Sequence, residues 1–304
     1  MNLEIDLQKK DNRVADFIII GAQKSGTTSL FRYLEQHPDI YMFPGKETYY
    51  LSNERISLEE YSSFFSGNTN EKLLGEASPQ YMYPNFDAAK MHDLLPNIKL
   101  IAILRNPTER FVSHFKMNLR RAKESRSISS CIREEISRYT SLSHDDYMSD
   151  SEMDYIGNGV YGKIIKKYIS LYGDSKIKIF HFDDFKRDTY FVLDEISSFL
   201  NLKPFKKIIF EKHNVSRQRK NITLYNLVTE LSTLSPFLNS IIKKIFGKNF
   251  ISKIMFNWET KWSMSKNTDF EININEDEFK KLSDFYKEDW KYCKSLMKRS
   301  KRNG

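Results

Sequence analysis

Residues 17–30 (FIIIGAQKSGTTSL) carry the groups needed to bind a terminal phosphate or sulfate. An Ile-rich run ends at Gly21, and a turn containing Lys24 and Gly26 leads into the start of a helix. Glycine permits positive φ and close backbone approach. The unpaired amides at a helix N-terminus favour an anion, and Lys24 adds a positive charge. The residues therefore predict an anion-binding loop. The plainer alternative is an ordinary strand-to-helix turn with a surface lysine.

This loop differs from the phosphate loop of NTPases at one position. Gly21 and Gly26 have the spacing of GxxxxGK[ST], but Thr27 stands where that motif has lysine. The sequence GAQKSGTTSL instead resembles the 5′-phosphosulfate-binding loop of sulfotransferases that use 3′-phosphoadenosine-5′-phosphosulfate (PAPS). The resemblance implies that Lys24 contacts the bridging oxygen and the sulfuryl group, while the following residues hold the 5′-phosphate. The expected donor-binding set in this loop is Gly21, Lys24, Ser25, Gly26, Thr27, Thr28 and Ser29.

A second segment, residues 99–113 (KLIAILRNPTERFVS), resembles the 3′-phosphate-binding segment of the same family. Arginine at a strand end can bind a phosphate through two nitrogens. The resemblance assigns Arg105 and Ser113 to the 3′-phosphate. The alternative is a charge at the end of a strand and a serine on a helix surface. The basic stretch 214–220 (NVSRQRK), with Arg217 and Lys220, is a candidate for a loop that closes over PAPS, although it lacks the glycine of the family's loop.

Residues 43–50 (FPGKETYY) resemble the Lys-Glu element of Golgi-type glycan sulfotransferases and their bacterial relatives. The resemblance makes Glu47 the general base and lets Lys46 share the charge of the sulfuryl oxygens. A solvated Lys-Glu pair is the alternative. Residues 75–81 (GEASPQY) resemble the family's Gly-Glu-Lys-Ser-x-x-Tyr segment, which makes Ser78 and Tyr81 candidates for acceptor binding.

The resemblance implies transfer of a sulfuryl group from PAPS to a hydroxyl or amine, with adenosine 3′,5′-bisphosphate (PAP) as the product. Ala77 stands where the family often has lysine, which weakens inference about the acceptor. The carboxylate-type motif favours a carbohydrate or glycolipid acceptor. A sulfuryl group carries less charge than a γ-phosphoryl group, so no metal ion is expected.

The elements that must position these residues alternate between short apolar runs and amphipathic segments, which predicts an α/β fold with a mainly parallel sheet covered by helices on both faces. The resemblance implies a P-loop-like three-layer form of it. Strands are expected at residues 16–21, 40–43, 73–77, 99–104 and 176–182. Helices are expected at 27–36, after Ser57, and at 86–95, from 107, 128–139, 160–172, 189–200 and 276–297. We expect a flexible arm at 1–15 and one domain at 16–304, with an insertion at 125–158 and a mostly helical part at 221–304.

The composition excludes several classes of protein. With 40% hydrophobic and 29% charged residues among 304, the chain is too apolar for intrinsic disorder. No apolar stretch is long enough to cross a bilayer, and the first residues do not form a signal sequence, so a cytoplasmic location is expected, with peripheral membrane association left open. The net charge of +8 suits an anionic ligand without identifying it.

Two other functions remain open at this point. One is an ATP-dependent P-loop kinase, because residues 177–184 (IKIFHFDD) imitate an apolar strand that runs into metal-binding aspartates. The other is a non-catalytic polyanion-binding protein, suggested by Arg120, Arg121, Lys123 and Arg126. No motif for nucleic acid is present, so a nucleic-acid partner is not expected. The acceptor and the oligomeric state cannot be deduced from these residues.

Overall fold

The computed structural model describes residues 13–52, 56–68, 70–141, 153–210, 217–219, 264–266, 272 and 274–300. A five-stranded sheet lies at its centre, with the strands in the order β2-β3-β1-β4-β5 and every neighbouring pair parallel. The strands are β1 (Phe17–Gly21), β2 (Ile40–Met42), β3 (Leu73–Ala77), β4 (Lys99–Leu104) and β5 (Ile177–His181). Each lies within one residue of its expected bounds, so the predicted α/β fold with a parallel sheet is confirmed.

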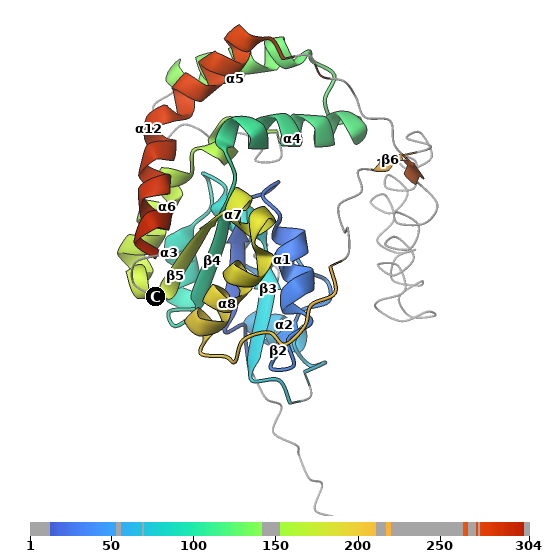
Figure 1. The fold of residues 1–304 in the computed structure, drawn as a ribbon, viewed down its shortest axis with the longest axis vertical. Helices are drawn as coiled ribbons and strands as arrows, with labels where there is room; N and C mark the ends of the chain where they lie inside the picture. Colours follow the sequence, from blue (N-terminus) through green and yellow to red (C-terminus); the bar gives the residue numbers. More distant parts are fainter. Residues whose placement is uncertain are drawn as a thin grey trace, which may run out of the picture.

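Helices cover both faces of this sheet (Figure 1). One face packs on α3 (Ala88–Leu94), α6 (Tyr161–Tyr172) and α12 (Glu276–Ser300), and the other on α1 (Thr27–Leu34) and α8 (Thr189–Leu200). The alternation of side chains along β1 explains this division. Ile18 and Ile20 belong to the first hydrophobic cluster, whereas Phe17 and Ile19 belong to the second.

The helix α4 (Pro107–Arg120) follows β4 and crosses the carboxyl end of the sheet (Figure 1). Its start matches the sequence signals. The Asn106 side chain accepts hydrogen bonds from the amides of Thr108 (3.0 Å) and Glu109 (3.4 Å), and proline occupies the first helical position. The cap before α2 (Leu58–Ser63) is also present, since Ser57 Oγ accepts from the Glu60 amide at 3.1 Å.

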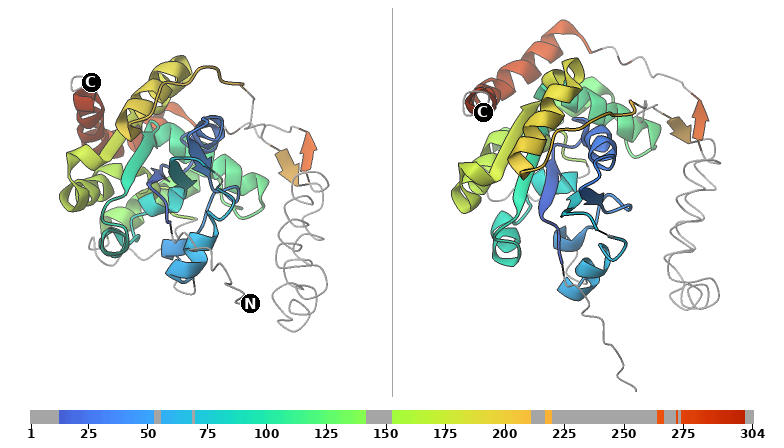
Figure 2. Two further views of the ribbon diagram at one scale, coloured as in Figure 1. Left: turned by 90° about the horizontal axis from the view of Figure 1, so that it is seen from below. Right: turned by 60° about the horizontal axis from the view of Figure 1, so that its bottom comes forward.

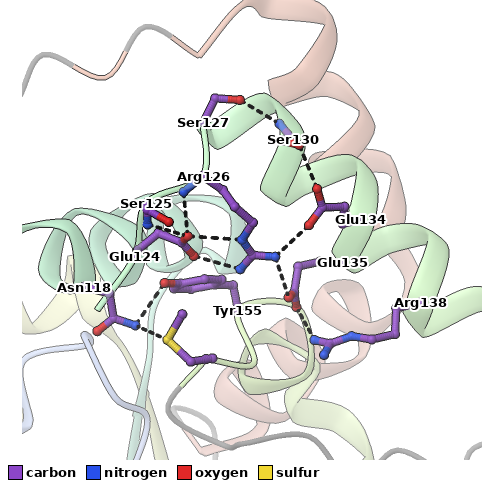
Figure 3. A network of polar contacts seen from close by, with 11 residues as sticks. Asn118, Glu124, Ser125, Arg126, Ser127, Ser130, Glu134, Glu135, Arg138 and Tyr155 are labelled. Carbon is purple, nitrogen blue, oxygen red and sulfur yellow. Dashed lines mark hydrogen bonds and ion pairs between the residues drawn. The ribbon is translucent and has the colours of Figure 1, made fainter. Parts of the chain in front are cut away.

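A third hydrophobic cluster joins α4 to α5 (Ile128–Ser141) and to the first half of α12. Both views in Figure 2 keep α12 beside α6, at the edge of the sheet formed by β5. A polar network closes the turn between α4 and α5 (Figure 3). In it, Arg126 donates to the buried carboxylate of Glu124 and to Glu134 on α5. The helical portion of the predicted insertion therefore packs into the core. Its acidic portion, residues 142–152, lies outside the described residues, as do residues 1–12 and all of 221–263.

One short helix was not expected. The strand β5 ends at His181, and α7 (Phe182–Arg187) begins at once, with Asp183 and Asp184 in its first turn. The His181 side chain accepts a hydrogen bond from the Asp183 amide, which stabilises the helix start. The two aspartates, which imitated the metal-binding end of a kinase strand, therefore lie on a helix. Among the described residues, no helix is long and apolar enough to cross a membrane.

Candidate active site

A cavity of about 1490 Å³ opens at the carboxyl end of the sheet. The loops after β1, β2 and β4 meet there because parallel strands end at the same edge. These loops, with α1 and α4, bring together most of the predicted site residues. The predicted residues that line the cavity are Lys24, Gly26, Thr27, Thr28, Ser29, Lys46, Glu47, Arg105 and Ser113.

The loop after β1 is shaped by left-handed backbone at two positions. Lys24 has φ 69° and Gly26 has φ 90°, and Gly26 is the cap residue of α1. A Cβ atom at Gly26 would meet the Phe182 ring at 2.9 Å, so both backbone conformation and space require glycine there. The residues of the first turn of α1, Thr27, Thr28 and Ser29, line the cavity.

Lys24 is surrounded by other positively charged side chains. Its Nζ lies 3.6 Å from the Met117 Sδ on α4. Burial of the ammonium group, together with the positive charges of the nearby Arg120, Arg121, Arg105 and Arg110, lowers the pKa of Lys24 to about 8. A buried ammonium group among arginines is stabilised by an anion, so this end of the cavity fits a phosphate or sulfate group.

Arg105 lies between a carboxylate and an aromatic ring. Its Nε and Nη2 bind Glu109 Oε2 at 3.1 and 3.0 Å, and its guanidinium carbon lies 5.1 Å from the centroid of the Phe182 ring. The Tyr161 hydroxyl donates to the Arg105 carbonyl at 3.1 Å. Ser113, partly buried on α4, lines the same cavity. The two residues predicted to bind one phosphate are therefore both at the cavity wall.

Glu47 enters the cavity from the loop after β2. The Lys46 Nζ lies 3.1 Å from Glu47 Oε1, and the two side chains are 20% and 30% exposed. The Lys46 backbone has φ 66°, and its carbonyl accepts a hydrogen bond from the Ala77 amide at 3.0 Å. A carboxylate paired with a lysine at the wall of a cavity can take up a proton while the lysine stabilises negative charge nearby.

Apart from the basic stretch 214–220, four predicted residues do not line the cavity. Gly21, the last residue of β1, and Ser25, within the loop that follows, are both buried. Ser78 and Tyr81 are fully buried: Ser78 Oγ donates to Glu76 Oε2 at 2.7 Å, and the Tyr81 hydroxyl accepts from the Leu51 amide at 3.4 Å. The structure thus brings their side chains to the protein interior, and a role in acceptor binding stays a prediction.

The predicted basic loop at 214–220 is described only in part. Arg217 lies in β6 (Arg217–Arg219), which pairs antiparallel with β7 (Met264–Lys266). Lys220 lies outside the described residues. Closure of this loop over a nucleotide stays a prediction.

Sequence reasoning missed several residues of the cavity wall. Arg120 and Arg121 line it, although their charge first suggested a polyanion-binding surface. A signal for them exists in the helical spacing of Ser113, Met117 and Arg120, which puts the three side chains on one face of α4. The aromatic lining residues were also missed: Tyr33, Tyr49, Tyr83, Phe86, Phe182, Phe185 and Phe210. Within the described ranges, no group of three or more His, Cys, Asp or Glu residues could hold a metal ion.

Comparison with known proteins identifies relatives of this chain. The family profile described as "Sulfotransferase domain" matches residues 15–229. The membrane-associated sulfotransferase kil1 of Dictyostelium discoideum is 38% identical over 116 residues, which cover 37% of this chain and 25% of that protein. The bifunctional heparan sulfate N-deacetylase/N-sulfotransferase 4 of Mus musculus is 24% identical over 208 residues, covering 65% of this chain and 23% of that protein.

The chain thus spans about a quarter of the length of these two relatives. Among solved structures, a sulfotransferase from Alicyclobacillus acidocaldarius superposes with a TM-score of 0.55 and 26% identity. That match covers 79% of this chain and 98% of the other.

Proposed function

Since the chain belongs to the sulfotransferase family, we propose that it transfers a sulfuryl group from PAPS to a hydroxyl or amine of a carbohydrate-containing acceptor. One observation carries the proposal. A single cavity is lined by the Lys24 loop, by Arg105 with Ser113, and by Glu47. The Lys24 loop suits the 5′-phosphosulfate of PAPS, and Arg105 with Ser113 suits its 3′-phosphate. Glu47 suits the general base that takes the proton of the acceptor.

The cationic end of the cavity suits a nucleotide with phosphates at two positions. The turn from Lys24 into α1 offers amides and hydroxyls to the 5′-phosphosulfate. Arg105 and Ser113 offer a separate site for the 3′-phosphate. Tyr33, Phe182 and Phe185 line the same cavity and offer aromatic surfaces on which a purine can stack.

The proposed reaction is an in-line displacement at sulfur. The acceptor oxygen or nitrogen forms a bond to sulfur while the bond from sulfur to the bridging oxygen of the 5′-phosphate breaks. The proton of the acceptor passes to the Glu47 carboxylate, and the electron pair of the broken bond stays on the departing phosphate of PAP. Lys24 stabilises the charge on that phosphate, and Lys46 stabilises the sulfuryl oxygens.

The remaining wall of the cavity supports a carbohydrate acceptor. Tyr49, Tyr83 and Phe86 supply aromatic surface, while Gln80 and Asn85 supply amides that both donate and accept hydrogen bonds. This mixture suits a ring with apolar faces and a rim of hydroxyls. The names of the relatives that act on heparan sulfate point to the same class of acceptor.

Calorimetric titration tests the donor. We expect PAP to bind without metal and ATP with Mg²⁺ to bind at least about tenfold more weakly, because ATP has no 3′-phosphate for Arg105. A preference for ATP with Mg²⁺ would favour the kinase alternative. Binding of generic duplex DNA without affinity for PAP would favour the polyanion-binding alternative. Incubating a cell extract with ³⁵S-labelled PAPS and the protein then identifies the acceptor from the labelled product.

A further inference from the structure

The carboxylate of Glu76 is fully buried near the end of β3, and three hydroxyl groups converge on it. Oε2 accepts hydrogen bonds from Thr48 Oγ1 at 2.6 Å and from Ser78 Oγ at 2.7 Å. Oε1 accepts from the Tyr61 hydroxyl at 2.9 Å. A buried carboxylate is costly unless donors surround it, and these donors come from three separate segments. The cluster therefore joins parts of the chain that are distant in sequence.

One of these donors belongs to the loop of the proposed base. Thr48 directly follows Glu47, and the residue on the other side, Lys46, accepts a hydrogen bond from the Ala77 amide at 3.0 Å. Both neighbours of Glu47 are thus attached to β3, at two consecutive residues. The position of Glu47 relative to the sheet depends on these two attachments.

The loop has little regular structure of its own to hold it. Lys46 and Tyr49 have φ of 66° and 56°, which are uncommon for residues other than glycine. Beyond Thr48, the Tyr50 ring stacks on the Tyr61 ring, with centroids 4.1 Å apart. Such backbone persists only where the surrounding contacts determine it. The Glu76 cluster supplies the shortest of the contacts that the loop makes with β3.

The same strand end also lies against the donor side of the cavity. The Ser78 amide donates to the Ile19 carbonyl of β1 at 3.1 Å, and β1 leads directly into the Lys24 loop. The pairing of β1 with β3 thus fixes the position of the Lys24 loop relative to the Glu47 loop. A displacement of about 1 Å between reacting groups can cost about a hundredfold in rate.

We infer that Glu76 is a positioning residue for sulfuryl transfer: its carboxylate holds Thr48, and through Thr48 it holds Glu47 against the donor site. The inference rests on the proposed role of Glu47 as general base. Glu76 itself is fully buried and does not line the cavity. Its effect on turnover must therefore pass through the loop.

Four variants test this role. Glu76→Gln weakens all three hydrogen bonds, Thr48→Val removes the link to the loop, and Thr48→Ser keeps the hydroxyl. Tyr61→Phe is the matched control, because it removes one donor to the same carboxylate and leaves the Thr48 link and the ring on Tyr50 in place. Turnover is followed as ³⁵S-sulfate released when labelled PAPS reacts with water, which avoids any dependence on the acceptor. Binding of PAP is measured by calorimetry.

We expect Glu76→Gln and Thr48→Val to lower turnover by about ten- to a hundredfold, with the Kd for PAP changed by less than about threefold. Thr48→Ser and Tyr61→Phe should keep turnover within about threefold. Hydrogen exchange of amides 46–51 should accelerate in the first two variants, while exchange in residues 22–30 stays unchanged. If Glu76→Gln fails to fold, Thr48→Val carries the test, because it leaves the carboxylate in place with its other two donors.

A double variant separates positioning from general loss of structure. In the Glu47→Gln background, adding Glu76→Gln should cost nothing more, because the base that it positions is already gone. If the turnover of the double variant falls by the product of the two single losses, or if amide exchange accelerates throughout the sheet, the role of Glu76 is purely structural and the inference is overturned. So would normal turnover and normal exchange of amides 46–51 in Glu76→Gln. The proposed role of Glu47 fails separately, if Glu47→Gln alone keeps full turnover.

Discussion

The guanidinium of Arg105 lies over the ring of Phe182, 5.1 Å from its centroid. The same guanidinium donates two hydrogen bonds to Glu109, which lies in the first turn of α4. Phe182 begins α7 and also fills the space beside Gly26. One aromatic ring therefore supports both the expected 3′-phosphate site and the loop expected to hold the 5′-phosphosulfate.

Replacing Arg105 should remove recognition of the 3′-phosphate. We expect Arg105→Ala to weaken PAP binding by about 10- to 100-fold, the value of one or two charged hydrogen bonds. Binding of adenosine 5′-phosphosulfate, which lacks the 3′-phosphate, should change by less than about threefold. Calorimetry with both nucleotides measures this. Glu109→Gln is the control, since it removes only the intramolecular partner of Arg105. An equal loss for both nucleotides would contradict the assignment.

The lowered pKa of Lys24 makes nucleotide binding depend on pH. Because that pKa is about 8 in the ligand-free protein and the protonated lysine binds the anion, affinity for PAP should fall as pH rises from 7.5 to 9.5. Calorimetry across this range in wild type and Lys24→Gln measures the effect. The variant should bind weakly at every pH and show a much flatter profile. An equal slope in both proteins would assign the titration to another group.

The same shift has a consequence for stability. A folded-state pKa below the unfolded value means that the unfolded chain binds more protons between about pH 8 and 10.5, so the free energy of unfolding rises with pH there. Below pH 8 Lys24 is protonated in both states, and its buried charge then lowers the free energy of unfolding of the ligand-free protein by the largest amount. Lys24→Gln should therefore raise the Tm of the ligand-free protein at pH 7. An unchanged Tm at pH 7 together with normal PAP affinity would show that Lys24 is not held in this place.

Gly26 and Gly173 both have positive φ, so alanine variants at the two positions can be compared. Gly26 has φ 90° and lies against Phe182, whereas Gly173 has φ 78° and nothing within 4 Å of a Cβ placed there. Both alanine variants should lose about 1 kcal/mol of stability from backbone strain. Only Gly26→Ala should also weaken PAP binding, because Phe182 must move and the loop with it. Thermal unfolding and PAP titration of both variants test this, and equal PAP affinity in the two would contradict it.

Glu47→Gln tests the proposed base directly. The amide keeps the size and the contact with Lys46 but cannot take up a proton. Turnover with the identified acceptor should fall by about two orders of magnitude or more, with PAP affinity nearly unchanged. Single-turnover measurements with labelled PAPS provide the rate. Full turnover in this variant would exclude Glu47 as the base.

Away from the cavity, Arg126 is expected to stabilise the turn between α4 and α5 (Figure 3). Burial raises the pKa of Glu124, but the hydrogen bonds from Arg126 outweigh it and hold the pKa below its usual value. This stability is present above the unfolded pKa of Glu124 and is lost as pH falls through the folded one. Arg126→Met should cost about 2–3 kcal/mol at pH 7 and clearly less near pH 4. Urea unfolding at both pH values measures this, and an equal loss at both would contradict the ionic origin.

Much of the fold could be predicted because its signals are local. The apolar run at Lys99–Leu104 and the Asn-Pro pair that follows it define β4 and the start of α4 without reference to distant residues. The start of the short helix α7 was missed because its apolar first residue, Phe182, was interpreted as the end of the strand β5. Whether such a run continues as a strand or turns into a helix depends on what covers it, and here the Phe182 ring packs against the Gly26 loop.

Local residue patterns were enough to predict the loop that holds Lys24, the strand end that holds Arg105, and the neighbouring lysine and carboxylate at Lys46 and Glu47, because each depends on neighbouring residue types. The contact of Ser78 with the buried carboxylate of Glu76 and the position of Arg120 at the cavity became known only from the folded structure. Those outcomes depend on how strands and helices that are distant in sequence pack together. A polar side chain is buried where packing supplies a hydrogen-bond partner, and otherwise it faces the cavity or solvent. A short sequence motif does not show those partners, because they come from distant parts of the chain.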